Sequence, residues 1–324
     1  MADAIIFKES GGPGVLQLEN RDIGPPGPGE LLLRQTAIGV NFFDLLLRSG
    51  AFPISLPSGI GGDSVGVVEA LGAGVEGFSI GDRIVSVGPQ PDAYATYRRA
   101  SAAYSLKLPD AVSDELAVAA ASKGLTAHYL ITQAFKVRPG DPILFHAAAG
   151  GVGQIACQWL KLLGAMVIGT VGSEDKIAFA LSHGCDVAIN YRAGDLVERV
   201  LEVTGGKGVA AVYDSVGKDT FGQSLDCLRV RGTLVSFGAA SGPIDPFDTS
   251  QLTAKGSLYL TRPSLAHYIA TREDLETGAK ALFELLGAGR IKVDITHRLP
   301  LADAAAAHAL MEARATTGAI ILIP

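Results

Sequence analysis

A glycine-rich turn is the segment of this chain with the clearest chemical meaning. The apolar run "PILFHAA" leads directly into "AGGVG", and Ala147, Gly150 and Gly153 have the spacing A-x-x-G-x-x-G. A glycine turn that opens a helix offers backbone N–H groups to an anion, and the helix dipole adds to the attraction. The turn is followed by apolar residues at helical spacing: Val152, Ile155, Ala156, Trp159, Leu160 and Leu163. Strand, glycine turn, helix and second strand together predict a site for the pyrophosphate of a dinucleotide.

The end of the second strand indicates which dinucleotide is bound. A site for NAD usually has Asp or Glu there, which binds the 2′-hydroxyl of the ribose. Here the strand ends in "GTVG", and Ser173 and Lys176 follow. A hydroxyl, free amides and an ammonium group suit a 2′-phosphate, although Glu174 and Asp175 would oppose a phosphate if they faced it. The sequence therefore favours NADPH over NADH.

Metal chemistry has few candidate ligands. The stretch "GIGGDSVGVV" has the rhythm G-H-E-x-x-G of zinc enzymes, but Gly62 stands where the histidine would be. Cys157, Cys185 and Cys227 are far apart and form no C-x-x-C pair. The histidines are scattered, and no paired carboxylates or Ser/His/Asp arrangement suggests hydrolysis. We expect no metal site, and we interpret Asp63 as structural and paired with a nearby base.

Composition limits the class of protein and its partners. The 324 residues are 48% hydrophobic and 19% charged, which suits two well-buried globular domains. The net charge is −6 without a cluster of Lys or Arg, so we expect no nucleic-acid partner. No long apolar run predicts a membrane span, and the start "MADAIIFKESGG" lacks the features of a signal peptide, which suggests the cytoplasm.

The texture of the sequence changes along the chain. Residues 1–125 contain short strand-like runs broken by Gly and Pro, which predict an antiparallel β domain. Residues 126–260 alternate strands and helices, which predicts a parallel, doubly wound α/β sheet. Residues 261–324 hold two helices and two strands, and we expect them to return to the first domain.

Several stretches resemble a known family. "GVNFFDLLLRSG", "LPSGIGGDSVGVV", "SKGLTAHYLI", "FHAAAGGVGQIACQWLKLLGA", "INYR", "VYDSVGKDT", "GSLYLTRPSL" and "EARATTGAIILIP" are similar to zinc-independent medium-chain dehydrogenases/reductases of the NADPH:quinone oxidoreductase (zeta-crystallin-like) type. The resemblance implies a GroES-like domain, a Rossmann domain, a cleft between them, and a homodimer formed through the edge of the Rossmann sheet near "GSLYLTRP".

The resemblance also implies roles for particular residues. Asn41 and Lys123 would provide polar contacts near the nicotinamide and the substrate. The remaining cofactor contacts would be Thr126, Gly150, Gly151, Val152, Ser173, Lys176, Tyr191, Gly217, Phe237, Gly238, Ser241 and Arg314. The substrate pocket would be lined by Phe42, Leu46 and Phe52; relatives often have tyrosines near the last two positions, so this pocket is expected to be more apolar.

A quinone suits a site without a metal, because it is a strong electrophile and its reduced anion is delocalised. Proximity, orientation and one or two polar groups then suffice for hydride transfer from NADPH. Two other functions stay open. One is NADPH-dependent reduction of α,β-unsaturated aldehydes or ketones, and the other is a non-enzymatic, crystallin-like protein that binds NADPH.

Overall fold

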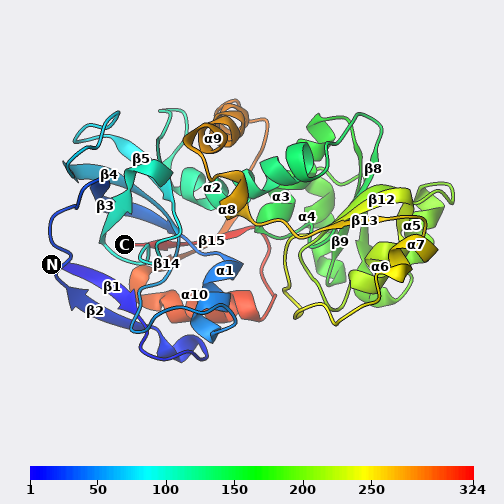
Figure 1. The fold of residues 1–324 in the computed structure, drawn as a ribbon, viewed down its shortest axis with the longest axis horizontal. Helices are drawn as coiled ribbons and strands as arrows, with labels where there is room; N and C mark the ends of the chain where they lie inside the picture. Colours follow the sequence, from blue (N-terminus) through cyan, green and yellow to red (C-terminus); the bar gives the residue numbers. More distant parts are fainter. The chain divides into compact units, whose positions relative to one another are not determined.

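The computed structural model describes residues 1–324, and the chain divides into two compact units. The first unit comprises residues 1–122 and 269–324, and the second comprises residues 123–268 (Figure 1). These divisions fall near residues 125 and 260, where the sequence changes texture. The unit boundaries differ from the expected ones by a few residues for two reasons. Helix α2 (Asp114–Tyr129) continues across the first boundary, and β13 (Tyr259–Thr261) and α8 (Leu265–Tyr268) belong to the second unit. No helix has the length and apolarity that a membrane span requires.

The first unit is built on a mixed sheet. Its strands run in the order β14-β15-β3-β4-β5-β7, and β6 pairs with β3. Their bounds are β3 (Glu30–Gly39), β4 (Asp63–Leu71), β5 (Arg83–Val87), β6 (Tyr97–Ser101), β7 (Ser105–Lys107), β14 (Ile295–Pro300) and β15 (Ala319–Ile323). Only β14 and β15 run parallel; the other neighbours are antiparallel. A separate antiparallel pair is formed by β1 (Ala2–Ile6) and β2 (Gln17–Arg21).

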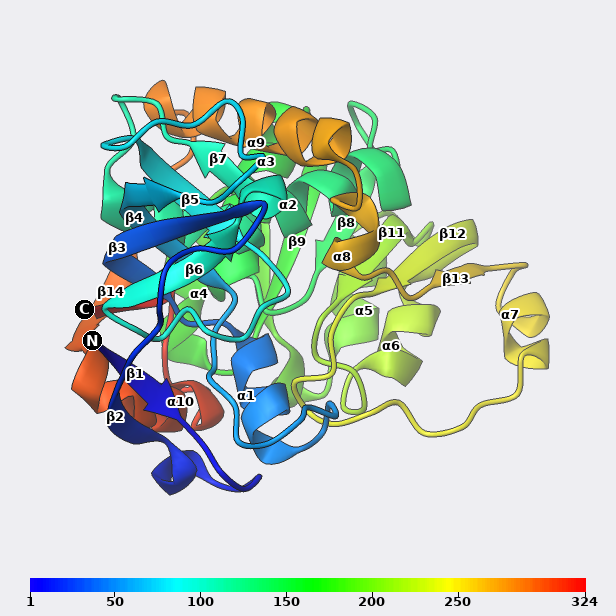
Figure 2. The same ribbon diagram turned by 60° about the vertical axis from the view of Figure 1, so that its left-hand side comes forward.

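The C-terminal segment completes this sheet. β15 pairs antiparallel with β3, so the two ends of the chain meet in one unit, and Figure 1 shows the red and blue strands side by side. Helices α1 (Phe42–Ser49) and α10 (Ala304–Glu312) contact each other. Helix α9 (Arg272–Gly287) lies beside β7 in Figure 2, where Arg272 donates to the Ser105 carbonyl at 2.6 Å.

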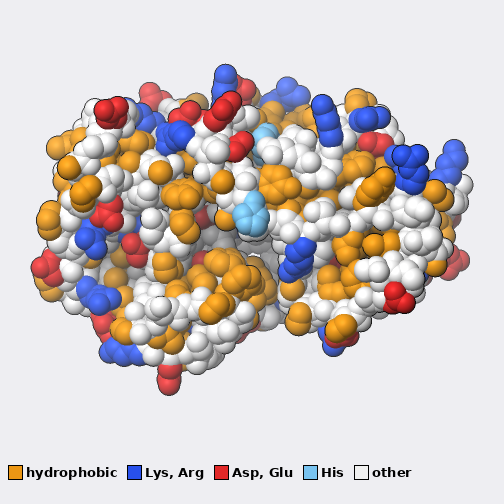
Figure 3. Space-filling view, viewed as in Figure 1, with side chains coloured by type: hydrophobic (Ala, Val, Ile, Leu, Met, Phe, Trp, Pro, Cys, Tyr) orange, Lys and Arg blue, Asp and Glu red, His pale blue; other side chains and the backbone are white.

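Side chains along β3 alternate between buried and more exposed positions, which explains how the sheet forms one face of the core. Leu31 and Leu33 are fully buried, whereas the intervening Leu32 is only half-buried, as expected for a strand with one core face. They pack with Val68 and Ile84 from the neighbouring strands. On the surface, basic and acidic side chains are interspersed over the face shown in Figure 3.

The second unit is a parallel sheet with the order β10-β9-β8-β11-β12-β13. The other strands are β8 (Pro142–Phe145), β9 (Met166–Val171), β10 (Val187–Asn190), β11 (Val209–Asp214) and β12 (Leu228–Ser236). The connecting helices are α3 (Gly151–Leu162), α4 (Ile177–Ser182), α5 (Leu196–Val203), α6 (Phe221–Asp226) and α7 (Ser250–Ala254). Strand β11 is buried throughout, the usual state of a central parallel strand covered on both faces. The predicted fold class, a β domain with a doubly wound parallel-sheet domain, is confirmed.

Candidate functional site

The glycine turn joins β8 to α3. Gly150 caps α3 in an extended conformation, and the amides of Gly151 and Val152 begin the helix, where N–H groups have no acceptor within the helix. A Cβ at Gly153 would meet the carbonyl oxygens of Ala147 and Ala148, the latter at 2.6 Å. Since backbone cannot yield as a flexible side chain can, only glycine fits there. The turn therefore has the close packing and exposed amides of a phosphate-binding turn.

The carboxyl end of β9 lies beside Tyr191. A Cβ at Gly172 would come within 3.7 Å of the Tyr191 ring and 3.9 Å of Arg192 Nε. The Arg192 guanidinium lies 5.8 Å from the centroid of the Tyr191 ring. Burial lowers the pKa of Lys176, and the charge of Arg192 lowers it further while Asp175 opposes the shift. Two cations thus lie close together where the sequence predicted a 2′-phosphate site.

The two acidic residues of this region are held by neighbouring groups. Glu174 accepts a hydrogen bond from Asn190 Nδ2 at 2.8 Å. The Ser173 hydroxyl bonds to Asp175 and is the main cause that lowers the pKa of that carboxyl. Sequence reasoning missed Arg192, although "INYR" contains it. The signal was available, because a second cation next to Tyr191 suits the 2′-phosphate that the sequence predicted here.

Two segments at the ends of β11 and β12 hold the residues expected beside the nicotinamide. The amide of Gly217 donates to Asp214 Oδ1 at 3.0 Å, and the amide of Phe237 donates to the Asp214 carbonyl at 2.8 Å. The Ser241 hydroxyl donates to the Val216 carbonyl at 2.7 Å. The structure therefore brings Gly217, Phe237 and Ser241 together around one turn, and Gly238 is included with its neighbour Phe237.

Helix α2 carries Lys123 and Thr126, which lie three residues apart and share a helix face. Lys123 is buried, and Thr126 is half-buried.

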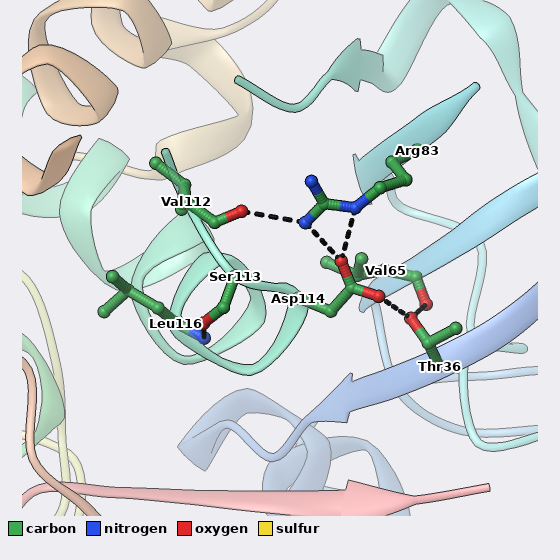
Figure 4. Close-up of polar contacts among 7 residues, drawn as sticks. All are labelled: Thr36, Val65, Arg83, Val112, Ser113, Asp114 and Leu116. Atoms are coloured by element: carbon green, nitrogen blue, oxygen red, sulfur yellow. Dashed lines mark hydrogen bonds and ion pairs between the residues drawn. The ribbon is translucent and has the colours of Figure 1, made fainter. Parts of the chain in front are cut away.

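The start of α2 is fixed by Asp114 (Figure 4). Its Oδ1 accepts from Arg83 Nε at 2.9 Å and from a terminal nitrogen of the same guanidinium at 2.6 Å. Its Oδ2 accepts from the Thr36 hydroxyl at 2.6 Å. Because these partners come from β5 and β3, they fix where α2 begins on the sheet.

Asn41 begins α1 and is bound to Asp63. The Asn41 Nδ2 donates to Asp63 Oδ2 at 2.9 Å, and the Ser122 hydroxyl donates to Asp63 Oδ1 at 2.6 Å. The backbone N–H of Asn41 donates to Asp44 Oδ2 at 2.8 Å. Asp63 is almost fully buried, and the two groups that bind its carboxylate are neutral, not the base suggested by the sequence. It acts as an acceptor that fixes the Asn41 side chain.

Asp44 is also bonded to Tyr94, which forms a buried polar pair with His308. The Tyr94 hydroxyl donates to Asp44 Oδ2 at 3.1 Å and lies 3.1 Å from His308 Nε2. Burial, with the nearby positive charge of Arg48, lowers the pKa of His308 to about 3. His308 is therefore neutral at physiological pH.

The expected pocket residues lie on and just after α1. Phe42 and Leu46 are half-buried, and Phe52, which is 49% exposed, donates its amide to the Leu46 carbonyl at 3.1 Å. The rings of Phe43 and Phe52 pack edge to face with centroids 5.1 Å apart. These side chains form an apolar surface. Arg314 follows α10 with an exposed side chain and a left-handed φ of 52°.

The residues at the positions of zinc ligands do not fit zinc. Gly62 has no side chain, Asn41 has a neutral amide, and all three cysteines are buried in the other unit. No group of three or more His, Cys, Asp or Glu residues could hold a metal ion. Zinc prefers thiolate, imidazole and carboxylate ligands that converge on one point.

Two family models match this chain. The one described as "Alcohol dehydrogenase GroES-like domain" matches residues 27–141, and the one described as "Zinc-binding dehydrogenase" matches residues 151–284. The quinone oxidoreductase of Salmonella typhimurium is 50% identical, with 100% of each chain covered. The 2-haloacrylate reductase of a Burkholderia species is 44% identical, with 100% of this chain and 99% of that protein covered.

The solved structures give the same result. The crystal structure of Escherichia coli quinone oxidoreductase complexed with NADPH has a TM-score of 0.98 and 48% identity, and covers 99% of this chain and 100% of that one. Such identity over the full length confirms the family resemblance seen in the sequence. The chain is thus an oxidoreductase that belongs to the quinone oxidoreductase family.

Proposed function

We propose that this protein is an NADPH-dependent quinone reductase that works without a metal. The observation that carries the proposal is the pair of neighbouring cations, Lys176 and Arg192, together with a complete glycine turn, in a chain 46–50% identical to bacterial quinone oxidoreductases. When bound, NADPH supplies a hydride and its electron pair to the acceptor. Each part of the described site then has a defined task.

The second unit provides the residues that would bind the cofactor. The amides of Gly151 and Val152 bind the pyrophosphate, and Gly150 and Gly153 allow the close approach. Lys176, Arg192, Ser173 and Tyr191 surround the adenosine ribose phosphate. Charge-assisted hydrogen bonds of this kind are about twice as strong as neutral ones, so the 2′-phosphate determines the preference for NADPH.

The other residues that the family resemblance implies orient the nicotinamide. Lys123 and Thr126, on one face of α2, border the nicotinamide ribose and ring. Gly217, Gly238 and Ser241 line its other side, with Phe237 as an apolar wall, and the family resemblance adds Arg314 as a further cofactor contact. The turns that hold Gly217, Phe237 and Ser241 are fixed by hydrogen bonds to Asp214 and Val216, so little reorganisation is needed on binding.

The substrate needs few polar groups. Hydride addition to a quinone gives a delocalised anion, which one or two donors can stabilise and which water can protonate. We assign these contacts to Asn41 and Lys123. Asp63 holds the Asn41 amide in place, and the apolar surface of Phe42, Leu46 and Phe52 favours flat, apolar quinones.

A substrate comparison tests this proposal. With NADPH fixed and saturating, kcat/KM is measured for 1,4-benzoquinone, 9,10-phenanthrenequinone and a simple enone. The quinones should be preferred, and phenanthrenequinone should exceed benzoquinone because of the apolar pocket. An enone preferred by orders of magnitude would overturn the assignment of substrate, and NADPH oxidation at background with every quinone would overturn quinone reduction itself.

The second candidate function is reduction of an activated C=C bond. It is favoured by the 44% identity to a 2-haloacrylate reductase over the whole chain. The carbanion formed by that reaction is more basic than a quinone anion and demands a stronger donor. 2-Chloroacrylate therefore belongs in the same panel, and turnover of it comparable to that of the quinones would establish this second activity.

We also propose a homodimer through the outer edge of the second unit's sheet. β13 is the last strand of that sheet, and Tyr259 on it is 56% exposed. An unpaired edge strand can pair with its copy in a second chain. Light scattering should give twice the chain mass, and Thr261→Pro at this edge should give the monomer; a wild-type protein of single chain mass would refute the dimer.

A further inference from the structure

Five polar side chains are sealed inside the second unit. They come from the residue after β8, from β9, from the end of β11, and from the start and middle of α6: His146, Thr170, Asp214, Thr220 and Ser224. Each is at most 1% exposed. Buried polar groups are costly unless they are hydrogen-bonded, so their arrangement requires an explanation.

The hydrogen bonds among them have one consistent direction. Asp214 accepts from the amides of Val216 and Gly217 and from the hydroxyls of Thr220 and Ser224, the pattern of a carboxylate. Ser224 has one hydroxyl proton, and it is donated to Asp214 Oδ2 at 2.8 Å. The Ser224 oxygen must then accept from His146 Nε2, which lies 3.0 Å away.

This assignment fixes the tautomer of His146. A neutral imidazole that donates from Nε2 accepts at Nδ1. Thr170 Oγ1 lies 2.8 Å from Nδ1, so its hydroxyl donates there. The burial of His146 lowers its pKa, which agrees with a neutral ring. The chain therefore runs from Thr170 through His146 and Ser224 to Asp214.

The Asp214 end of this chain shapes one half of the proposed cofactor site. Its carboxylate holds the amides of Val216 and Gly217, and its backbone carbonyl accepts from Phe237 and Gly238 at 2.8 and 3.3 Å. A single residue thus fixes both segments assigned to the nicotinamide side.

The Thr170 end of the hydrogen-bond chain contacts the glycine turn, the other half of the proposed cofactor site. The Ala148 amide, within the glycine turn, donates to the Thr170 carbonyl at 2.9 Å. His146 directly precedes that turn and donates its own amide to the Tyr213 carbonyl at 2.9 Å. The side-chain network therefore spans β9, β8 and β11 beneath the site.

The arrangement differs from that of a hydrolase. Ser, His and Asp do meet, but Ser224 lies between the other two and gives its proton to the carboxylate. A nucleophilic serine would give its proton to the imidazole and would face solvent. Ser224 has no exposed surface, so the network is not catalytic.

We infer that Asp214, Ser224 and His146 are positioning residues for the nicotinamide half of the cofactor, through a directional hydrogen-bond chain that holds the 214–217 and 236–241 segments against the glycine turn. The inference rests on the proposed function, because that function defines what the segments bind. It assigns a task to buried side chains that would not touch the cofactor themselves.

The tautomer provides the first test. Nitrogen-15 NMR of the full-length protein with labelled histidine, assigned with His146→Asn, should show the His146 proton on Nε2. In Asp214→Asn the new amide would donate to Ser224, the hydroxyl would turn toward His146, and the proton should move to Nδ1. A wild-type proton on Nδ1, or an unchanged tautomer in folded Asp214→Asn, would overturn the chain. The wild-type measurement decides even if the variant does not fold.

Ligand binding provides the second test. Ser224→Ala is compared with Thr204→Val, which removes a hydroxyl that bonds to Val200, Leu201 and Gly208 at the end of α5 in the same unit. NADPH is measured by fluorescence, and 2′,5′-ADP, which lacks the nicotinamide half, by competition. Ser224→Ala should weaken NADPH about tenfold, as expected for one broken buried hydrogen bond, and should change 2′,5′-ADP less than about twofold. Thr204→Val should change neither.

The possible results distinguish the positioning role of the hydrogen-bond chain from the binding of NADPH itself. Equal weakening of both ligands by Ser224→Ala would show general destabilisation, and no weakening of NADPH would show that the chain positions nothing; either result overturns the inference. A wild-type protein that binds neither ligand would instead overturn the proposed cofactor.

Discussion

Replacement of Lys176 by Ala should reduce the preference for NADPH over NADH by roughly 30-fold. Lys176 is half-buried and lies close enough to Arg192 for the two charges to interact. A hydrogen bond from a cation to a charged acceptor contributes about 2 kcal/mol, which equals roughly 30-fold in affinity. NADH has no 2′-phosphate, so its affinity should change less than about twofold. The more exposed Arg192 should contribute a smaller factor, about fivefold, because solvent screens it.

The assay is the Kd of each dinucleotide by fluorescence titration at one ionic strength, for the wild type, Lys176→Ala, Arg192→Ala and the double variant. Lys207→Ala is the matched control, since this lysine is exposed in the same unit after α5. Lys176→Arg should restore most of the preference. Equal losses for NADPH and NADH in Lys176→Ala would refute the reasoning, because they would place Lys176 away from the 2′-phosphate.

Three further predictions concern stability. The pKa of His308 is lowered to about 3 in the folded protein, whereas an unfolded histidine titrates near 6.5. Between these two pH values, only the unfolded state binds a proton at His308. Stability should therefore fall as pH drops from 6.5, by up to about 1.4 kcal/mol per unit; His308→Gln should reduce this slope in urea unfolding, and exposed His267→Gln should leave it unchanged. Gly153→Ala should lower the Tm and abolish NADPH binding, because its Cβ meets turn carbonyls at costs of about 1–3 kcal/mol, whereas Gly222→Ala, with open space around the Cβ, should do neither. Asp63→Ala removes the carboxylate that accepts from the half-buried Asn41 amide and Ser122 hydroxyl, and should cost about 1–3 kcal/mol in urea unfolding and also lower kcat; a normal kcat would separate Asp63 from the orientation of the amide that it binds.

Local patterns allowed much of the fold to be predicted. The alternation around Leu31 and Leu33 and the helical spacing after the glycine turn each report on a single element, so one window of sequence is sufficient. The glycine turn was recognisable for the same reason, since its function depends on backbone that adjacent residues control. The division between units was harder to place, because α2 crosses it without any change of pattern.

Side-chain partners were not predictable in this way. Asp63 and Asn41 are 22 residues apart, and His146 and Ser224 are 78 residues apart, so no local pattern links them. The sequence shows the residue types but not which hydroxyl faces which carboxylate. Arg192 is different, because it is adjacent to Tyr191, and attention to charge beside an assigned aromatic would have included it.

The Asn41–Asp63 hydrogen bond explains how a buried carboxylate is stabilised at a site without a metal. At the two positions that the family resemblance assigns to zinc ligands, this chain has the neutral amide of Asn41 and Gly62 without a side chain, neither of which suits zinc. The remaining carboxylate is buried, and a buried charge needs donors. The Asn41 amide and the Ser122 hydroxyl provide them at 2.9 and 2.6 Å. The acid thus stabilises the orientation of the amide, which in our proposal contacts the substrate oxygen. A quinone is already a strong electrophile, so a neutral donor such as this amide suffices for the substrate that we propose.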